Sequence, residues 1–134
     1  MAAIATITQL KSFRTWHCGV TLEGAKKLAA LKQRTSINLG QRLANAPPVT
    51  LPDAALPVLA ELSLLEDVSL QEAPLTLSAL SQLKKLSHLK RLTLDEIGIS
   101  ESDIAALKQQ LPGAKVTWTP PNEAAKKRIS ALFL

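Results

Sequence analysis

The residues best suited to chemistry lie in one short run, LKSFRTWHCGV, at positions 10–20. Cys18 is the only cysteine of the chain and directly follows His17, and such a pair can act as nucleophile and base or as two metal ligands. The second histidine is His88, and Asp95 and Glu96 form an adjacent acidic pair. Whether any of these groups work together depends on the elements that position them.

Other catalytic patterns are absent from the sequence. The five glycines are scattered, so no glycine-rich phosphate loop is present, and no zinc-protease, EF-hand or dinucleotide-binding motif occurs. No Ser/His/Asp set is convincing, and one cysteine is too few for an internal disulfide or a cysteine-based zinc site. We therefore expect no catalytic residues, no metal site, no cofactor and no enzymatic activity.

The composition favours a regular aliphatic architecture. The 134 residues suit one domain, 46% of them are hydrophobic, and only 3% are aromatic, so the core must be aliphatic and built mostly from Leu and Ala. The net charge of +5 is uneven: residues 1–48 carry seven basic and one acidic side chain, residues 49–81 five acidic ones, and residues 82–134 nine basic and five acidic ones. This alternation argues against one continuous phosphate-binding stripe.

Apolar positions recur along the chain at a regular interval. The run Leu89-xx-Leu92-x-Leu94-xx-Ile97-x-Ile99 has an apolar copy one interval earlier, Leu65-xx-Val68-x-Leu70-xx-Ala73-x-Leu75. A first copy starts at Leu10, and a weaker second copy has Arg34 and Arg42 at apolar positions. The short alternating stretches predict five β-strands, whose first inward residues are Phe13, Ile37, Val68, Leu92 and Val116.

These runs resemble the leucine-rich repeat pattern LxxLxLxxN/CxL, most closely that of cysteine-containing and bacterial members of the family. The interval of about 24 residues is within the range of that family. The resemblance covers residues 7–118. It implies an α/β fold: a right-handed solenoid of about five β–α repeats, with a parallel sheet on its concave side. It specifies a fold well and an activity poorly.

Each strand is followed by a segment with helical spacing. The apolar faces are Val20, Gly24, Leu28 and Leu31; Leu56, Leu59 and Leu62; Leu80, Leu83 and Leu86; and Ile104, Leu107 and Leu111. Helix caps are expected at Thr21, at Thr50 with Pro52, at Thr76, and at Ser100 with Asp103.

Two regions depart from the regular period. The second repeat is longer, with a loop near residues 40–50 that contains Pro47–Pro48. Residues 119–134 follow the solenoid of residues 1–118 as a tail, with Asn122 as an expected N-cap and a short helix that caps the last repeat. The alternatives are that this helix docks a partner or makes an oligomer contact, or that the tail is disordered.

The position of each candidate chemical residue in the repeat predicts its environment. Cys18 is equivalent to Ala73 and Ile97, which predicts a buried thiol with a packing role. His17 and His88 lie about three repeats apart and are expected on the surface, and Asp95–Glu96 is expected as an exposed acidic turn. Trp118 takes an inward position, and Lys11, Arg34, Lys84, Lys85, Lys90 and Arg91 are expected to form a basic rim at the strand entrances.

The resemblance directs attention to the outward strand positions, which in this fold line the concave face. The candidate partner-binding residues are Arg14, Trp16, Asn38, Asp67, Ser69, Gln71, Arg91, Thr93, Asp95, Lys115 and Thr117. Trp16 is conspicuous because an exposed aromatic on a polar sheet is a common hot spot. Burial of Trp16 beneath the N-terminal segment is the structural alternative.

The sequence thus predicts a non-enzymatic, scaffold-like module that binds a protein partner through the concave sheet and its adjoining loops. One alternative is a structural or assembly subunit that uses the solenoid ends or the tail. A second is an accessory protein associated with nucleic acid, which the excess of basic residues suggests. No window approaches the roughly 18 apolar residues of a membrane-spanning helix, and the N-terminus lacks a basic segment before its apolar stretch, so a cytoplasmic location is expected.

Overall fold

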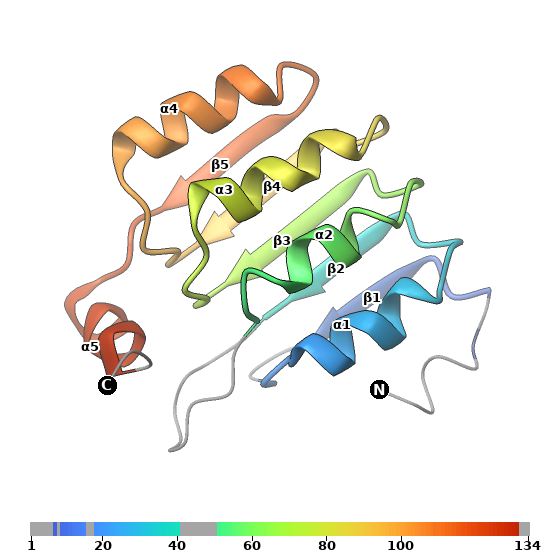
Figure 1. Cartoon of the computed structure of the whole chain (residues 1–134), viewed down its shortest axis with the longest axis horizontal. Helices are drawn as coiled ribbons and strands as arrows, with labels where there is room; N and C mark the ends of the chain where they lie inside the picture. The colour runs from blue at the N-terminus through green and yellow to red at the C-terminus, as the bar shows by residue number, and fades with distance from the viewer. Residues whose placement is uncertain (1–6, 8, 16–17, 41–50, 132–134) are drawn as a thin grey trace.

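The computed structural model describes residues 7, 9–15, 18–40 and 51–131. Within them, strands and helices alternate along the chain (Figure 1). The strands are β1 (Ser12–Thr15), β2 (Ser36–Leu39), β3 (Asp67–Gln71), β4 (Arg91–Asp95) and β5 (Lys115–Thr119). The helices are α1 (Leu22–Ala29), α2 (Ala55–Leu59), α3 (Leu77–Leu80), the 3-10 helix η2 (Ser81–Lys85), α4 (Glu101–Gln110) and α5 (Glu123–Ala131).

The five strands form one parallel sheet in the order in which they occur in the sequence. The strand register aligns the five predicted inward residues across the sheet: Phe13, Ile37, Val68, Leu92 and Val116. The predicted phase of all five repeats is therefore confirmed, including the longer step between the second and third strands.

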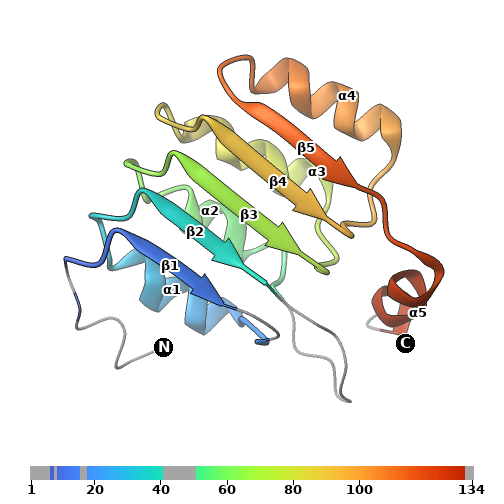
Figure 2. The same cartoon turned by 180° about the vertical axis from the view of Figure 1, so that it is seen from behind.

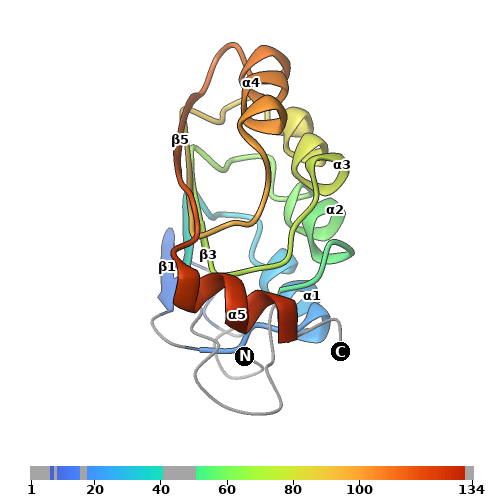
Figure 3. The same cartoon turned by 90° about the vertical axis from the view of Figure 1, so that its left-hand side faces the viewer.

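Helices α1 to α4 cover one face of the sheet, which gives a structure of two layers (Figures 1 and 3). The other face of the sheet carries no described helix (Figure 2). We call it the open face, and it corresponds to the concave face that the sequence predicted. The repeat solenoid expected from the residue pattern is thus present.

Side chains close the ends of several helices as expected. The hydroxyl oxygens of Thr21 and Thr76 accept hydrogen bonds from the N–H groups of Gly24 and Ala79. Ser100 and Asp103 form a reciprocal capping box at the start of α4. Helix α2 differs, because its N-cap is Ala54, which has no side-chain acceptor, whereas the expected cap Thr50 lies outside the described residues.

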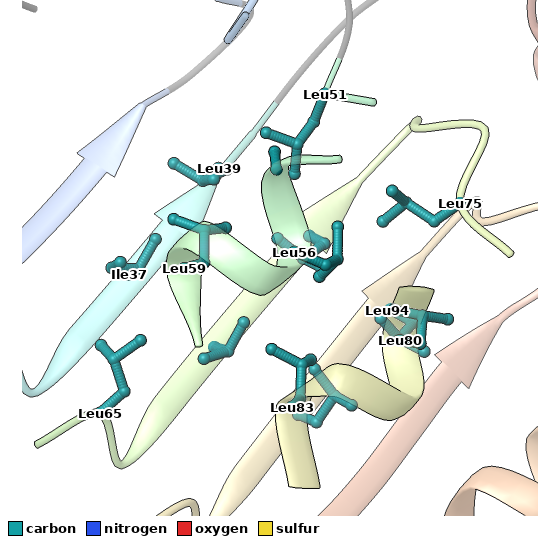
Figure 4. Packing of buried hydrophobic residues seen from close by; sticks show 14 of the residues in the cluster. Ile37, Leu39, Leu51, Leu56, Leu59, Leu65, Leu75, Leu80, Leu83 and Leu94 are labelled. Atoms are coloured by element: carbon teal, nitrogen blue, oxygen red, sulfur yellow. The ribbon is translucent and has the colours of Figure 1, made fainter. Parts of the chain in front are cut away.

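The core between the layers is aliphatic, as the low aromatic content requires (Figure 4). Leu39, Leu70 and Leu94 point inward from successive strands and are fully buried. Leu56, Leu80 and Leu107 meet them from the helices and are also fully buried. Each such side chain contributes about 1.5–3 kcal/mol by leaving water, so stacked repeats gain a core that one repeat alone lacks.

A C-terminal helix is present as α5, as predicted, but it does not lie over the free edge of β5 in the last repeat (Figure 2). Asn122 is its N-cap, since its side-chain oxygen accepts the N–H of Ala125 at 2.9 Å. Ala125 is fully buried, and Arg128 binds Glu72, the residue that follows β3. Helix α5 therefore packs along the edge where the strands end, as Figure 3 shows.

Candidate functional site

The open face presents the predicted binding residues in rows, because partners in a parallel sheet lie side by side. Ten of the eleven candidates lie on strands at outward positions, and Trp16 lies outside the described residues, as does His17. The first row is Ser12, Ser36, Asp67, Arg91 and Lys115. The second row is Arg14, Asn38, Ser69, Thr93 and Thr117, and the third contains Gln71, Asp95 and Thr119.

A hollow of about 290 Å³ lies on the open face over β2, β3 and β4. Its polar lining is made of Ser36, Asn38, Asp67, Ser69, Arg91 and Thr93. Serine and threonine side chains are short, so a depression forms where longer side chains surround them. Hydroxyl and amide groups both donate and accept hydrogen bonds, which makes the hollow suited to polar groups of a partner.

An ion pair orients the largest side chain of the hollow. Arg91 donates from Nε and Nη2 to the two carboxylate oxygens of Asp67, and the Nη2–Oδ2 distance is 2.9 Å. This hydrogen bonding lowers the pKa of Asp67 and raises the pKa of Arg91, so both groups stay charged. Because the Arg91 side chain is 69% exposed, the pair adds little stability but holds the guanidinium beside the hollow.

A second polar cluster lies at the edge where the strands end, and the sequence did not predict it. Glu72 and Glu96 follow β3 and β4, and both have positive φ angles, of 46° and 53°. Arg128 Nε and Nη2 donate to the two oxygens of Glu72 at 3.1 Å, and Arg128 Nη2 lies 3.9 Å from Glu96 Oε2. Asn122 Nδ2 donates to Glu96 Oε1 at 2.6 Å. The signal in the sequence was the recurrence of Glu at the same position of two successive repeats.

The surroundings of Glu96 correct the prediction of an exposed acidic turn. Its side chain is 16% exposed. Burial raises the pKa of Glu96, the neighbouring Glu72 and Asp95 raise it further, and Arg128 opposes them. The turn is therefore part of the α5 contact, because α5 covers it.

The structure also corrects the interpretation of Cys18. Cys18 is exposed, whereas the equivalent residues Ala73 and Ile97 are fully buried. The reason is the position of β1 at the edge of the sheet. Among the described residues, the turn after β1 has a neighbouring repeat on one side only, where Cys18 N–H donates to Gly40 C=O at 3.2 Å. His88 is exposed, as expected.

The predicted basic rim loses one of its members. Arg34 is fully buried at the position that Leu65 and Leu89 occupy in later repeats, because the repeat period directs it inward. Its Nη2 donates to Ile7 C=O at 3.4 Å, whereas Nε and Nη1 have no hydrogen-bond partner among the described residues. Burial lowers the pKa of Arg34. Lys90 remains on the surface and pairs with Glu66 at 2.8 Å.

Trp118 packs against the core, as its inward position predicted. It is half-buried, and its Nε1 donates to Ile97 C=O at 3.0 Å.

Within the described part of the chain, no group of three or more His, Cys, Asp or Glu side chains is arranged to hold a metal ion. None of the described helices has the length and apolar character needed to cross a membrane.

Comparison with known proteins identifies the fold. No family model and no curated protein matches the chain. A solved leucine-rich repeat protein of Leptospira interrogans is similar, with a TM-score of 0.54 and 20% identity over 84% of this chain. This chain spans 27% of the length of that protein. At this identity the likeness shows the fold alone, and it confirms the resemblance that the residue pattern indicated: the chain has the fold of the leucine-rich repeat proteins.

Proposed function

We propose that this chain is a non-enzymatic module that binds a protein partner through the open face of its sheet. The observation that carries the proposal is the polar hollow over β2 to β4, with Arg91 held at its side by Asp67. The fold supports a role in protein interaction in general. The choice of surface rests on this arrangement of side chains.

The chemistry of the face defines the kind of contact. The second row offers a guanidinium, an amide and three hydroxyl groups at intervals of about 4.8 Å across the sheet. No large apolar side chain points from these rows on the described strands. We therefore expect a partner that contributes hydrogen-bonding groups, with main-chain amides or polar side chains entering the hollow.

An affinity capture from the native host tests the proposal when two matched variants are compared. The first replaces Arg14, Asn38 and Arg91 with Ala on the open face. The second replaces Lys27, Lys108 and Gln109 with Ala on the helical layer, where all three are exposed. Each variant loses two positive charges and one amide, and nuclease treatment removes partners that nucleic acid bridges.

The expected result is loss of a specific partner by the open-face variant and its retention by the helical-layer variant. Retention by both variants would contradict the choice of surface. If the partner is captured only when nucleic acid is left intact, a nucleic-acid-associated role is favoured instead.

We also propose a cytoplasmic location for this binding. A single cysteine, exposed in the structure, needs no oxidising compartment for the fold to form. Fractionation of the native host, with the chain followed by antibody, is expected to recover it with cytoplasmic markers. Recovery with membrane or secreted markers would contradict this placement.

A further inference from the structure

The last strand, β5, leaves one edge of the sheet open. It pairs with β4 on one side, and no described segment lies beside its other side (Figures 1 and 2). Lys115 N–H donates to Lys90 C=O at 2.8 Å, and Thr119 C=O accepts from Glu96 N–H at 2.9 Å. Because neighbouring residues of a strand direct their main-chain groups to opposite edges, Val116 and Trp118 direct theirs outward. Two N–H and two C=O groups therefore face the open edge.

The C-terminal helix does not cover this edge. Pro120 and Pro121 end β5, and the chain turns away toward α5 (Figure 2). Helix α5 is fixed at the strand ends through Arg128 and Glu72. Proline and bulges, which block strand addition in many proteins, are absent from the five residues of β5.

We propose that β5 pairs in antiparallel orientation with β5 of a second copy of this chain. A two-fold axis at Thr117 places Val116 opposite Trp118 of the second copy. Residues opposite each other in such a pair exchange both main-chain hydrogen bonds, so four bonds form and all outward groups are satisfied. Thr117 meets its own counterpart on the axis, and Thr–Thr pairs are favourable in sheets.

Charges on the open face are complementary in this register. Lys115 is beside Arg91 within its own sheet, a like-charge neighbour, and no carboxylate pairs with it among the described residues. Across the axis, Lys115 lies opposite Thr119 of the second copy, whose inner neighbour is Asp95. Two strand spacings, about 10 Å between Cα atoms, separate Lys115 from that Asp95, and the two extended side chains span this distance.

The proposal goes beyond the binding function of a single open face. It joins two sheets of five strands into one continuous sheet, so that two copies of each candidate binding row face the same side. The symmetry arises because the edge is complementary to itself after a half turn about the two-fold axis.

Measurement of the molar mass of the full chain, by light scattering and sedimentation over a wide concentration range, tests the proposal. A self-associating chain exceeds its monomer mass of 14.4 kDa as concentration rises. Thr117→Lys places two like charges on the axis and is expected to abolish the dimer. Thr93→Lys is the matched control, because Thr93 is an exposed residue of the same row on β4.

Charge reversal provides a second, independent variant set. Lys115→Asp is expected to weaken the dimer by about tenfold, and Lys115→Asp combined with Asp95→Lys is expected to restore it. The proposal is overturned if the chain stays at its monomer mass throughout, or if Thr117→Lys leaves a dimer intact. Equal dissociation of the Thr117→Lys and Thr93→Lys variants would also overturn it, because the contact would then lie elsewhere on the face.

Discussion

Replacement of Arg128 by Ala tests how the C-terminal helix is held. Arg128 binds both oxygens of Glu72 at 3.1 Å, and the two partners lie 56 positions apart in the sequence. The Glu72 side chain is 3% exposed, whereas that of Arg128 is 28% exposed. The substitution leaves a buried carboxylate without this guanidinium.

The expected cost lies between two limits. Removing one partner of a fully buried ion pair costs about 3–5 kcal/mol, and an exposed pair is worth about 0.2–1 kcal/mol. Because Arg128 is partly exposed, and because α5 can leave its site and let water reach Glu72, we expect a loss of about 2 kcal/mol. The loss should appear first as undocking of α5, since Ala125 is the only buried residue along the described helix.

Two measurements follow this effect. Urea unfolding monitored by circular dichroism gives the change in free energy of unfolding, and amide hydrogen exchange shows whether residues 123–131 lose protection. Lys126→Ala is the control, because Lys126 pairs with Glu123 within the same helix and is exposed. Unchanged exchange and unchanged stability in Arg128→Ala would refute the reasoning.

Three further substitutions test the cluster, the buried arginine and the core. Burial raises the pKa of Glu96, so the Glu96 side chain stabilises the fold at low pH, and this contribution is lost as the pH rises through the raised pKa. The Glu96→Gln variant should therefore become more stable relative to the original chain as the pH rises above 4.5, the ordinary pKa of this carboxyl group. Parallel pH profiles of the free energy of unfolding for the two proteins would contradict this. Arg34→Leu should raise the free energy of unfolding, measured in urea, by about 1–3 kcal/mol. Leu65 fills the equivalent site, and the substitution removes two buried nitrogens that have no hydrogen-bond partner among the described residues; a less stable variant would show that Arg34 has a partner. Leu70→Ala should lower the free energy of unfolding by about 2–5 kcal/mol, and with it the melting temperature, because Leu70 is fully buried. Leu64→Ala is the control: its side chain is 38% exposed, so the free energy of unfolding should change by less than about 0.5 kcal/mol. Similar shifts in melting temperature for the two variants would contradict the assigned core.

The period of the sequence was sufficient to predict the sheet. Each strand alternates inward and outward residues, so one apolar position in phase, such as Val68 or Leu92, orients its whole strand. The helix faces followed for the same reason, because the residues between strands must bury an apolar stripe against the sheet. These features depend on local spacing, which a sequence displays directly.

The errors concern positions where neighbours decide the environment. Cys18 follows the edge strand β1, whereas the repeat pattern that predicts its burial comes from inner repeats. An inner repeat is buried because it has a neighbouring repeat on each side. The charge of Arg34 predicts a surface position on the rim, whereas its position in the repeat directs its side chain inward, where it is buried. The Glu72–Arg128 contact joins residues of two unrelated elements, and no periodicity relates them.

The sequence predicts which residues form the rows of the open face, but it does not predict the hollow. Register assigns Asn38, Ser69 and Thr93 to one row without any coordinates. The depth of the hollow depends on which side chains turn aside, and Arg91 turns toward Asp67 because a bidentate pair forms there.

Site-specific photo-crosslinking in the native host tests the central claim most directly. A photoreactive amino acid at Thr93 reports on the open face, and the same residue at Ala105, an exposed position of α4, reports on the helical layer. The account predicts that Thr93 crosslinks to one defined protein partner and that Ala105 does not. Crosslinking of a partner from Ala105 alone would contradict it.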